Sequence, residues 1–180
     1  MIEGENEFMT DVLFYQNYTY VADISAIVLC IICWLLLHSS YTVREKSLII
    51  FKAGTVCLMM ATVCSISFHT AITRITESRK ILIYVLQDGI YLLLILTFVL
   101  LCNYFGTLLK LEERPARLLG AVSWGGYAVF AFLEIGSPFT HLGFYIDADL
   151  MVHQNFYFDP FRFAYIYYCI VLVVVLFTYR

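Results

Sequence analysis

Charged residues are scarce in this chain of 180 residues. They make up 14% of the sequence, whereas hydrophobic residues make up 62%. Soluble globular domains contain about 25% charged and roughly 45–50% apolar residues. Proline is also rare, and its 3 residues all lie at the ends of long apolar runs, where it is tolerated. This composition excludes an ordinary soluble domain and predicts an integral membrane protein.

Catalytic motifs are absent from the sequence. It has no glycine-rich phosphate loop, no nucleophile elbow and no HExxH motif. Cys30 and Cys33 have a redox spacing, but both lie inside an apolar run, where we interpret the cysteines as small packing residues. His38 lies at the inner end of the first run and His69 near the outer end of the second, so they cannot pair at one depth around a haem. We expect no enzyme activity and no cofactor in these residues.

Two further classes of segment are missing. No basic run suggests a nucleic-acid partner, and the net charge is −3. The first 17 residues are acidic and lack the basic leader of a cleavable signal peptide. We expect the first apolar run to act as an uncleaved insertion signal.

The apolar runs themselves predict the fold. A helix needs about 20 apolar residues to cross the hydrocarbon core of a bilayer. Such runs lie at approximately 18–38, 48–72, 81–105, 118–138 and 161–179. We predict an all-α, polytopic transmembrane helix bundle of about five spans. It forms a single domain over residues 1–180, in a cell (plasma) membrane, with one sizeable loop at approximately 139–160.

Basic residues predict the orientation. Short loops on the cytoplasmic side are enriched in Lys and Arg. With the N-terminus outside, the basic residues inside are Arg44, Lys46, Lys52, Lys110, Arg114, Arg117 and Arg180. Those outside are Arg74, Arg79, Lys80 and Arg162. Seven against four favours an N-out, C-in topology.

Ionisable residues interrupt the apolar runs at similar depths. Asp88 lies in the run "ILIYVLQDGIYLLLILTFVLLC" (81–102), and Asp23, His69 and Glu134 each lie one turn from the end of another run. Intramembrane ionisable residues are costly and usually face the bundle interior. We therefore predict a polar chamber near the outer face, covered by the 139–160 loop, that senses a ligand or a proton.

Tyr84 and Tyr91 flank Asp88 at helical spacing and are expected to partner it. Interfacial or structural roles remain open for Asp23 and Glu134, because a carboxylate one turn from the interface reaches headgroups or water.

The 139–160 loop adds a weaker metal hypothesis. Its candidate ligands are His141, Asp147, Asp149 and His153, which are residue types that bind metals. Their spacing is irregular, and acidic loops are commonly just solvated.

Two patches carry a resemblance to a known family. These are "FYFDPFRFAYIYY" (156–168), within the longer run 141–180, and "NYTYVADISAIVL" (17–29). They resemble the N-terminal multi-helix membrane sensor regions of bacterial GGDEF and EAL signalling proteins, which make or degrade cyclic-di-GMP. Similar seven-helix regions precede histidine kinases. The resemblance implies an input region whose partner is a cytoplasmic output domain.

The chain itself contains no GGDEF-like or EAL-like motif, so we expect it to be the truncated N-terminal part of a larger sensor. Its expected partners are the lipid bilayer, an output domain or protein and an unknown small-molecule ligand, with a homodimer left open. The alternative function is a small proton- or ion-coupled transporter, or an accessory membrane subunit. A carrier is disfavoured, because the sequence shows no inverted repeat and no mid-span proline.

Overall fold

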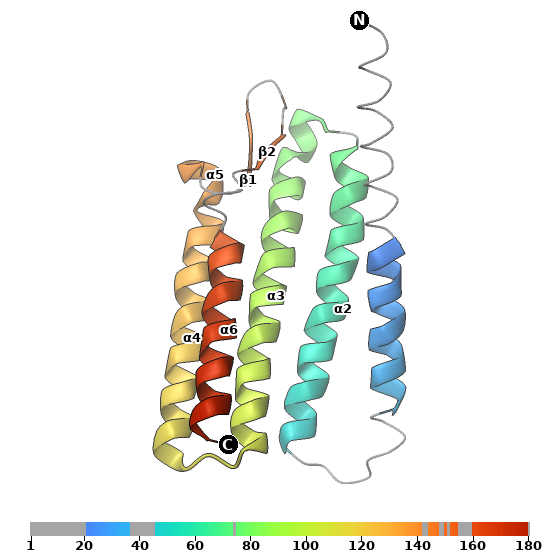
Figure 1. The fold of residues 1–180 in the computed structure, drawn as a ribbon. Coiled ribbons are helices and arrows are strands. Elements are labelled where there is room, and N and C mark those ends of the chain that lie inside the picture. Colours follow the sequence, from blue (N-terminus) through green and yellow to red (C-terminus); the bar gives the residue numbers. More distant parts are fainter. Residues whose placement is uncertain are drawn as a thin grey trace, which may run out of the picture.

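A computed structural model of the chain describes residues 21–36, 46–73, 75–141, 144–147, 150, 152–154 and 160–179. The long helices in this part of the chain are Val21–Leu36, α2 (Lys46–Ile72), α3 (Lys80–Leu108), α4 (Glu113–Ile135) and α6 (Pro160–Thr178). The short elements are the 3₁₀ turn η1 (Glu77–Arg79), α5 (Ser137–Thr140), β1 (Phe144–Ile146) and β2 (Val152–Gln154). The predicted helical fold is thus confirmed (Figure 1).

Four of these helices are long and apolar enough to cross a membrane, among the residues described. They are α2, the stretch Glu77–Leu108 that contains α3, α4 and α6, with mean hydropathies of 1.9, 2.2, 1.5 and 2.1. The helix Val21–Leu36 is apolar but shorter, and the rest of the expected 18–38 run lies outside the described residues. The chain is a helical membrane protein by length and composition.

The helix ends agree with the expected runs except in α4. We expected this helix at 118–138, whereas it begins at Glu113 and ends at Ile135. Pro115 therefore lies in the first turn, where its missing N–H costs no helical hydrogen bond. At the other end, Gly136 follows the helix, and Pro138 belongs to the separate short helix α5. Pro115 and Pro138 thus lie near the two ends of α4, but neither is the residue at which the helix begins or ends.

The 139–160 segment is more than a loop. β1 and β2 pair antiparallel, with Tyr145 opposite His153 and Ile146 opposite Val152. The hairpin lies at the end of the bundle where α2 ends and α3 begins (Figure 1). Alternating burial explains its position, because Phe144 and Ile146 are both 5% exposed, while Tyr145 between them points away.

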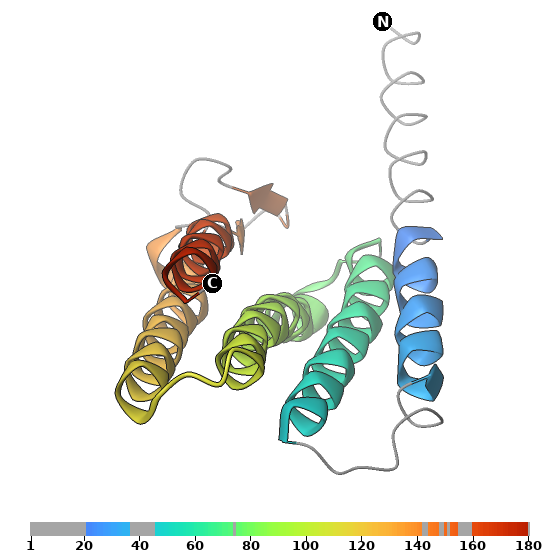
Figure 2. The same cartoon turned by 60° about the horizontal axis from the view of Figure 1, so that its bottom comes forward.

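Helix α3 is the central element of the bundle. It packs against α2 on one side and against α4 and α6 on the other (Figure 2). Ile95, Val99 and Cys102 on α3 are fully buried, together with Ala164 and Tyr168 of α6. Residues 95, 99 and 102 recur at helical spacing, so they form one stripe of α3.

The helix Val21–Leu36 lies along α2 (Figure 1). Two side-chain contacts hold it there: Ser65 donates a hydrogen bond to Asp23 at 2.8 Å, and the Lys52 ammonium lies 5.7 Å from the Trp34 ring centre. The six cysteines are all free thiols, which agrees with their interpretation as packing residues.

Candidate functional site

A cavity of 260 Å³ lies between α2 and α3, beneath the hairpin. Its polar lining comes from Ser65 and His69 of α2 and Gln87 of α3. The remaining lining residues are Phe68, Ile72, Ile90, Tyr91, Phe144 and Val152. A mostly apolar wall with a few converging polar groups is typical of small-ligand pockets, which range from about 300 to 1,000 Å³. The cavity is slightly smaller, which suits a small ligand such as a single amino acid or sugar.

The polar side of this cavity is connected to a third helix. The Ser65 hydroxyl donates to the Asp23 carboxylate at 2.8 Å. The same carboxylate acts electrostatically on the His69 imidazole, one turn further along α2. A hydrogen bond to a charged group is roughly twice as strong as one between neutral groups. Asp23 therefore holds Ser65 in place behind the cavity. It also interacts with His69, so two of the ionisable residues predicted from the sequence lie together.

Gln87 supplies the polar group on the opposite wall. Its side chain is 5% exposed, although it lies about 10 Å into α3 at 1.5 Å per residue from Lys80. A buried amide offers both hydrogen-bond donors and an acceptor. With Ser65 and His69 it gives the cavity donors and acceptors on two facing helices.

The hairpin closes this cavity through Phe144 and Val152. The Phe144 ring contacts Phe68 of α2 at 5.7 Å and Tyr84 of α3 at 5.8 Å, measured between ring centres. Both pairs have the edge-to-face geometry that aromatic rings prefer. The Phe144 carbonyl also accepts a hydrogen bond from Ser137 of α5 at 3.3 Å. One hairpin residue thus touches the cavity, α2, α3 and the segment after α4.

Both expected tyrosines lie near the cavity, but each has a partner other than Asp88. The Tyr84 hydroxyl accepts a hydrogen bond from the Ile146 backbone N–H at 2.7 Å. The Tyr91 ring lines the cavity and stacks on Phe161 of α6, with centres 4.8 Å apart. Their roles are to tie α3 to the hairpin and to α6.

Asp88 and Glu134 lie outside the lining of this cavity. Asp88 is half-buried on α3, next to Gln87, and forms no hydrogen bond or ion pair with the residues that the structure describes. Glu134 is 1% exposed near the end of α4. Of the four ionisable residues expected to share one chamber, the structure brings Asp23 and His69 together.

The loop residues of the metal hypothesis gather on the outer side of the hairpin. His153 lies 2.9 Å from Asp147, measured from Nε2 to Oδ2, and its ring stacks on Tyr145, which also contacts His141. No group of three or more His, Cys, Asp or Glu side chains close enough to hold a metal ion occurs in the described ranges. Asp149 lies outside those ranges.

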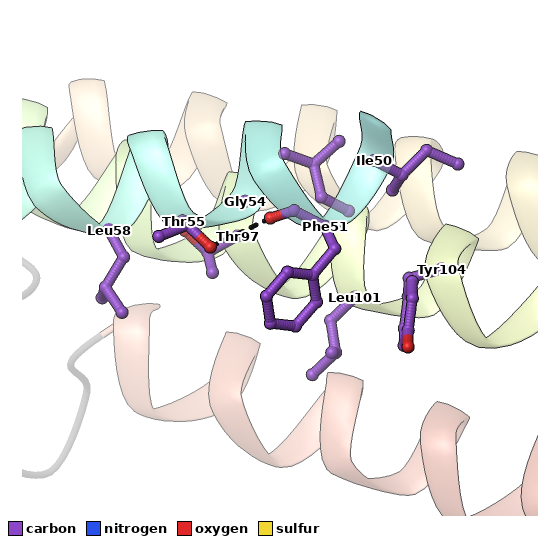
Figure 3. Close-up of a pocket in the computed structure, with 9 residues that line it drawn as sticks. Ile50, Phe51, Gly54, Thr55, Leu58, Thr97, Leu101 and Tyr104 are labelled. Atoms are coloured by element: carbon purple, nitrogen blue, oxygen red, sulfur yellow. Dashed lines mark hydrogen bonds between the residues drawn. The ribbon is translucent and has the colours of Figure 1, made fainter. Parts of the chain in front are cut away.

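A second cavity between α2 and α3 differs in chemistry. Its volume is 140 Å³, and Figure 3 shows its lining, which comes from the first half of α2 and the second half of α3. The Thr55 hydroxyl that lines it donates to the Phe51 carbonyl of its own helix at 3.1 Å. The Phe51 and Tyr104 rings lie with their centres 5.5 Å apart. This apolar space has no converging polar groups and is better explained as a gap in packing.

Sequence reasoning chose Asp88 and missed Gln87 as a site residue. Helical spacing carried the missing signal, because Gln87 and Tyr91 are four residues apart and share a face, whereas Asp88 is rotated by about 100°. The residue types of Ser65 and Phe144 gave no indication in the sequence that these two residues line the cavity. No family model, curated protein or solved structure matches the chain.

Proposed function

We propose that this chain is a membrane-embedded input module, and that the cavity beneath the hairpin receives its stimulus. The observation that carries this proposal is the position of Phe144, which lines the cavity and contacts both α2 and α3. A ligand in the cavity meets Phe144 and the polar groups of the two helices at once. Its binding therefore has a direct physical route to the packing of α2 against α3.

The orientation belongs to the same proposal. In an N-out, C-in bundle of five spans, the hairpin end faces the outside of the cell membrane. Among the described residues, the opposite end carries Lys46, Lys52, Lys110, Arg114 and Arg117. The hairpin end carries Arg79, Lys80 and Arg162. The positive-inside rule supports this direction, and the stimulus then passes from outside to a cytoplasmic partner.

The partner is a cytoplasmic output domain or protein. The resemblance of residues 156–168 and 17–29 to bacterial sensor regions supports a diguanylate cyclase or a phosphodiesterase in this role. Tightly packed helices switch between discrete packing arrangements rather than deforming smoothly, so a small shift at one site can change the packing of the whole pair. A change in the α2–α3 contact at the cavity then reaches the ends of both helices.

The first experiment measures ligand binding to the purified full chain. Thermal unfolding is recorded in lipid nanodiscs with a panel of free amino acids, monosaccharides and dicarboxylates. A ligand present at 100 times its Kd stabilises the folded state by about 2.7 kcal/mol. We expect at least one compound to raise the Tm of the natural chain and to lose that effect in Gln87→Leu.

Thr97→Val is the matched control, because it also removes a polar group from α3 but lies outside the cavity. The compound must stabilise this control as it does the natural chain. An equal Tm rise in Gln87→Leu, or no rise with any compound, contradicts a ligand site at this cavity.

A proton- or ion-coupled transporter is the competing function, because Asp23, Ser65 and His69 form a polar chain across two helices. Proton and cation flux in liposomes separates the two functions. An input module gives no flux above that of empty liposomes, whereas a transporter gives flux that Asp23→Asn abolishes.

A further inference from the structure

A polar cavity near the opposite end of the bundle has a composition unlike that of the site above. It has a volume of 500 Å³ and lies where α2 begins, α3 ends and α4 begins. Figure 2 shows α2 and α4 on either side of α3 at this end. Its lining residues are Lys46, Ile50, Leu100, Asn103, Gly106, Thr107, Lys110, Leu111, Ala116, Leu119 and Trp124.

Positive charge is concentrated at one end of this cavity. Lys46 is the first residue of α2, and Lys110 follows the end of α3, so two separate elements each supply an ammonium group. Among the residues that the structure describes, no acidic side chain belongs to the lining. Two ammonium groups without a carboxylate between them form an electrostatic site for an anion.

The cavity becomes apolar with depth. Lys110 and Leu100 both line it, and the helical part between them, from Leu100 to the end of α3 at Leu108, corresponds to roughly 12 Å. Along α3, Leu100 is the lining residue furthest from Lys110, and Asn103 and Thr107 lie between the two. A basic end, a polar middle and an apolar end along α3 match the headgroup, glycerol backbone and acyl chain of an anionic phospholipid.

We propose that this cavity binds an anionic phospholipid, with the lipid phosphate between Lys46 and Lys110 and an acyl chain along α3 towards Leu100. Basic pockets between transmembrane helices on the cytoplasmic side are known to hold anionic headgroups. The bound lipid contacts α2, α3 and α4 together and fixes their spacing at this end of the bundle. This site is separate from the hairpin cavity, and its place on the cytoplasmic side rests on the proposed orientation.

The test measures lipid binding to the full chain in detergent by native mass spectrometry. The probes are phosphatidylglycerol, phosphatidylcholine and inorganic phosphate, and the variant is Lys46→Gln with Lys110→Asn. Asparagine suits position 110, because the backbone there is left-handed with φ of 48° and asparagine tolerates this conformation. A basic residue near a membrane surface contributes roughly fivefold in affinity, so the double variant should bind phosphatidylglycerol about 25-fold more weakly.

The control variant removes two positive charges from the same end of the bundle without touching the cavity. Arg114→Gln with Arg117→Gln fits, because both residues are exposed and neither lines the cavity. This control should bind phosphatidylglycerol as the natural chain does. Equal weakening in both double variants would show only a general charge effect and would overturn the proposal.

Two other results would also overturn it. One is phosphatidylcholine binding as tightly as phosphatidylglycerol, and the other is inorganic phosphate displacing the lipid at equal concentration, which would identify a free anion as the ligand. If the double variant does not fold, each single variant decides the question. The proposal predicts a roughly fivefold loss for Lys46→Gln and for Lys110→Asn, and no loss for either rejects it.

Discussion

The phenol oxygen of Tyr84 lies 2.7 Å from the backbone nitrogen of Ile146, and this hydrogen bond joins a membrane-spanning helix to the hairpin beyond it. Ile146 is 5% exposed, so its N–H has little access to water. Nearby, the Lys80 ammonium donates to the Asp147 carbonyl at 3.0 Å. The hairpin that closes the candidate cavity is therefore fixed to α3 at neighbouring backbone positions.

Removing the Tyr84 hydroxyl should loosen this hairpin without moving the ring. In Tyr84→Phe the Ile146 N–H loses its acceptor, and a buried unsatisfied N–H costs about 1–3 kcal/mol. We expect faster amide hydrogen exchange in residues 144–147 and 152–154, at roughly tenfold for each 1.4 kcal/mol. The aromatic contact with Phe144 remains, so α3 itself should keep its protection.

Tyr91→Phe is the control for this experiment. Its ring stacks on Phe161, and phenylalanine preserves that stacking. Unchanged hairpin exchange in Tyr84→Phe, or the same acceleration in both variants, would contradict the anchoring role of Tyr84.

The hydrogen bond between Ser65 and Asp23 should hold the helix Val21–Leu36 against α2. Ser65→Ala removes the donor, and a hydrogen bond to a charged group is worth about 1.5–3 kcal/mol. We expect a lower Tm and weaker cross-linking between cysteines introduced at exposed positions of these two helices.

Ser67→Ala provides the comparison on the same helix. Ser67 is exposed and donates within α2 to the Val63 carbonyl at 2.9 Å, so its loss should change stability by less than about 0.5 kcal/mol. If both alanine variants behave alike, the Asp23–Ser65 contact does not hold the helices together.

The packing of α4 against α6 should depend on Gly126. A Cβ at this position would lie 2.5 Å from Cε1 of Tyr167, whose hydroxyl donates to the Val122 carbonyl at 2.9 Å. Gly126→Ala must move that ring, and overpacking of this kind costs about 1–3 kcal/mol. Thermal unfolding in detergent measures the loss.

Gly120 lies on the same helix and gives the opposite expectation. A Cβ there has no neighbour within 4 Å, so Gly120→Ala should be neutral or stabilising by up to about 1 kcal/mol. Equal destabilisation by both substitutions would show that the α4–α6 contact is not close-packed at Gly126.

The sequence predicts the helices well because hydropathy and length determine them. The run expected at 48–72 corresponds to α2 at Lys46–Ile72, and the run at 161–179 to α6 at Pro160–Thr178. The hairpin was not predicted, because its strands have only three residues each and depend on contacts with Phe68, Ile83 and Tyr84 far along the chain. Such contacts leave no local pattern.

The candidate site was only partly predictable for a similar reason. Charge drew attention to Asp88, yet the neighbouring Gln87 faces the cavity, because rotation around the helix axis determines which side chain points inward. Asp23 and His69 were predicted at similar depths, and the structure brings them within electrostatic range through helices that pack side by side. The register between neighbouring helices decides these contacts, and no single helix reveals it alone.

The most direct test of the input function asks whether filling the hairpin cavity changes the far end of the bundle. Spin labels are placed at Ile49 of α2 and Leu118 of α4, which are 50% and 66% exposed. Their separation is measured by pulsed electron resonance in nanodiscs, with and without the compound that gives the largest Tm rise. Transmission of the stimulus predicts a change of about 1–2 Å, the size of helix shifts in known switches, and its loss in Gln87→Leu. An unchanged distance while the compound is bound would contradict an input module and leave a binding site without transmission.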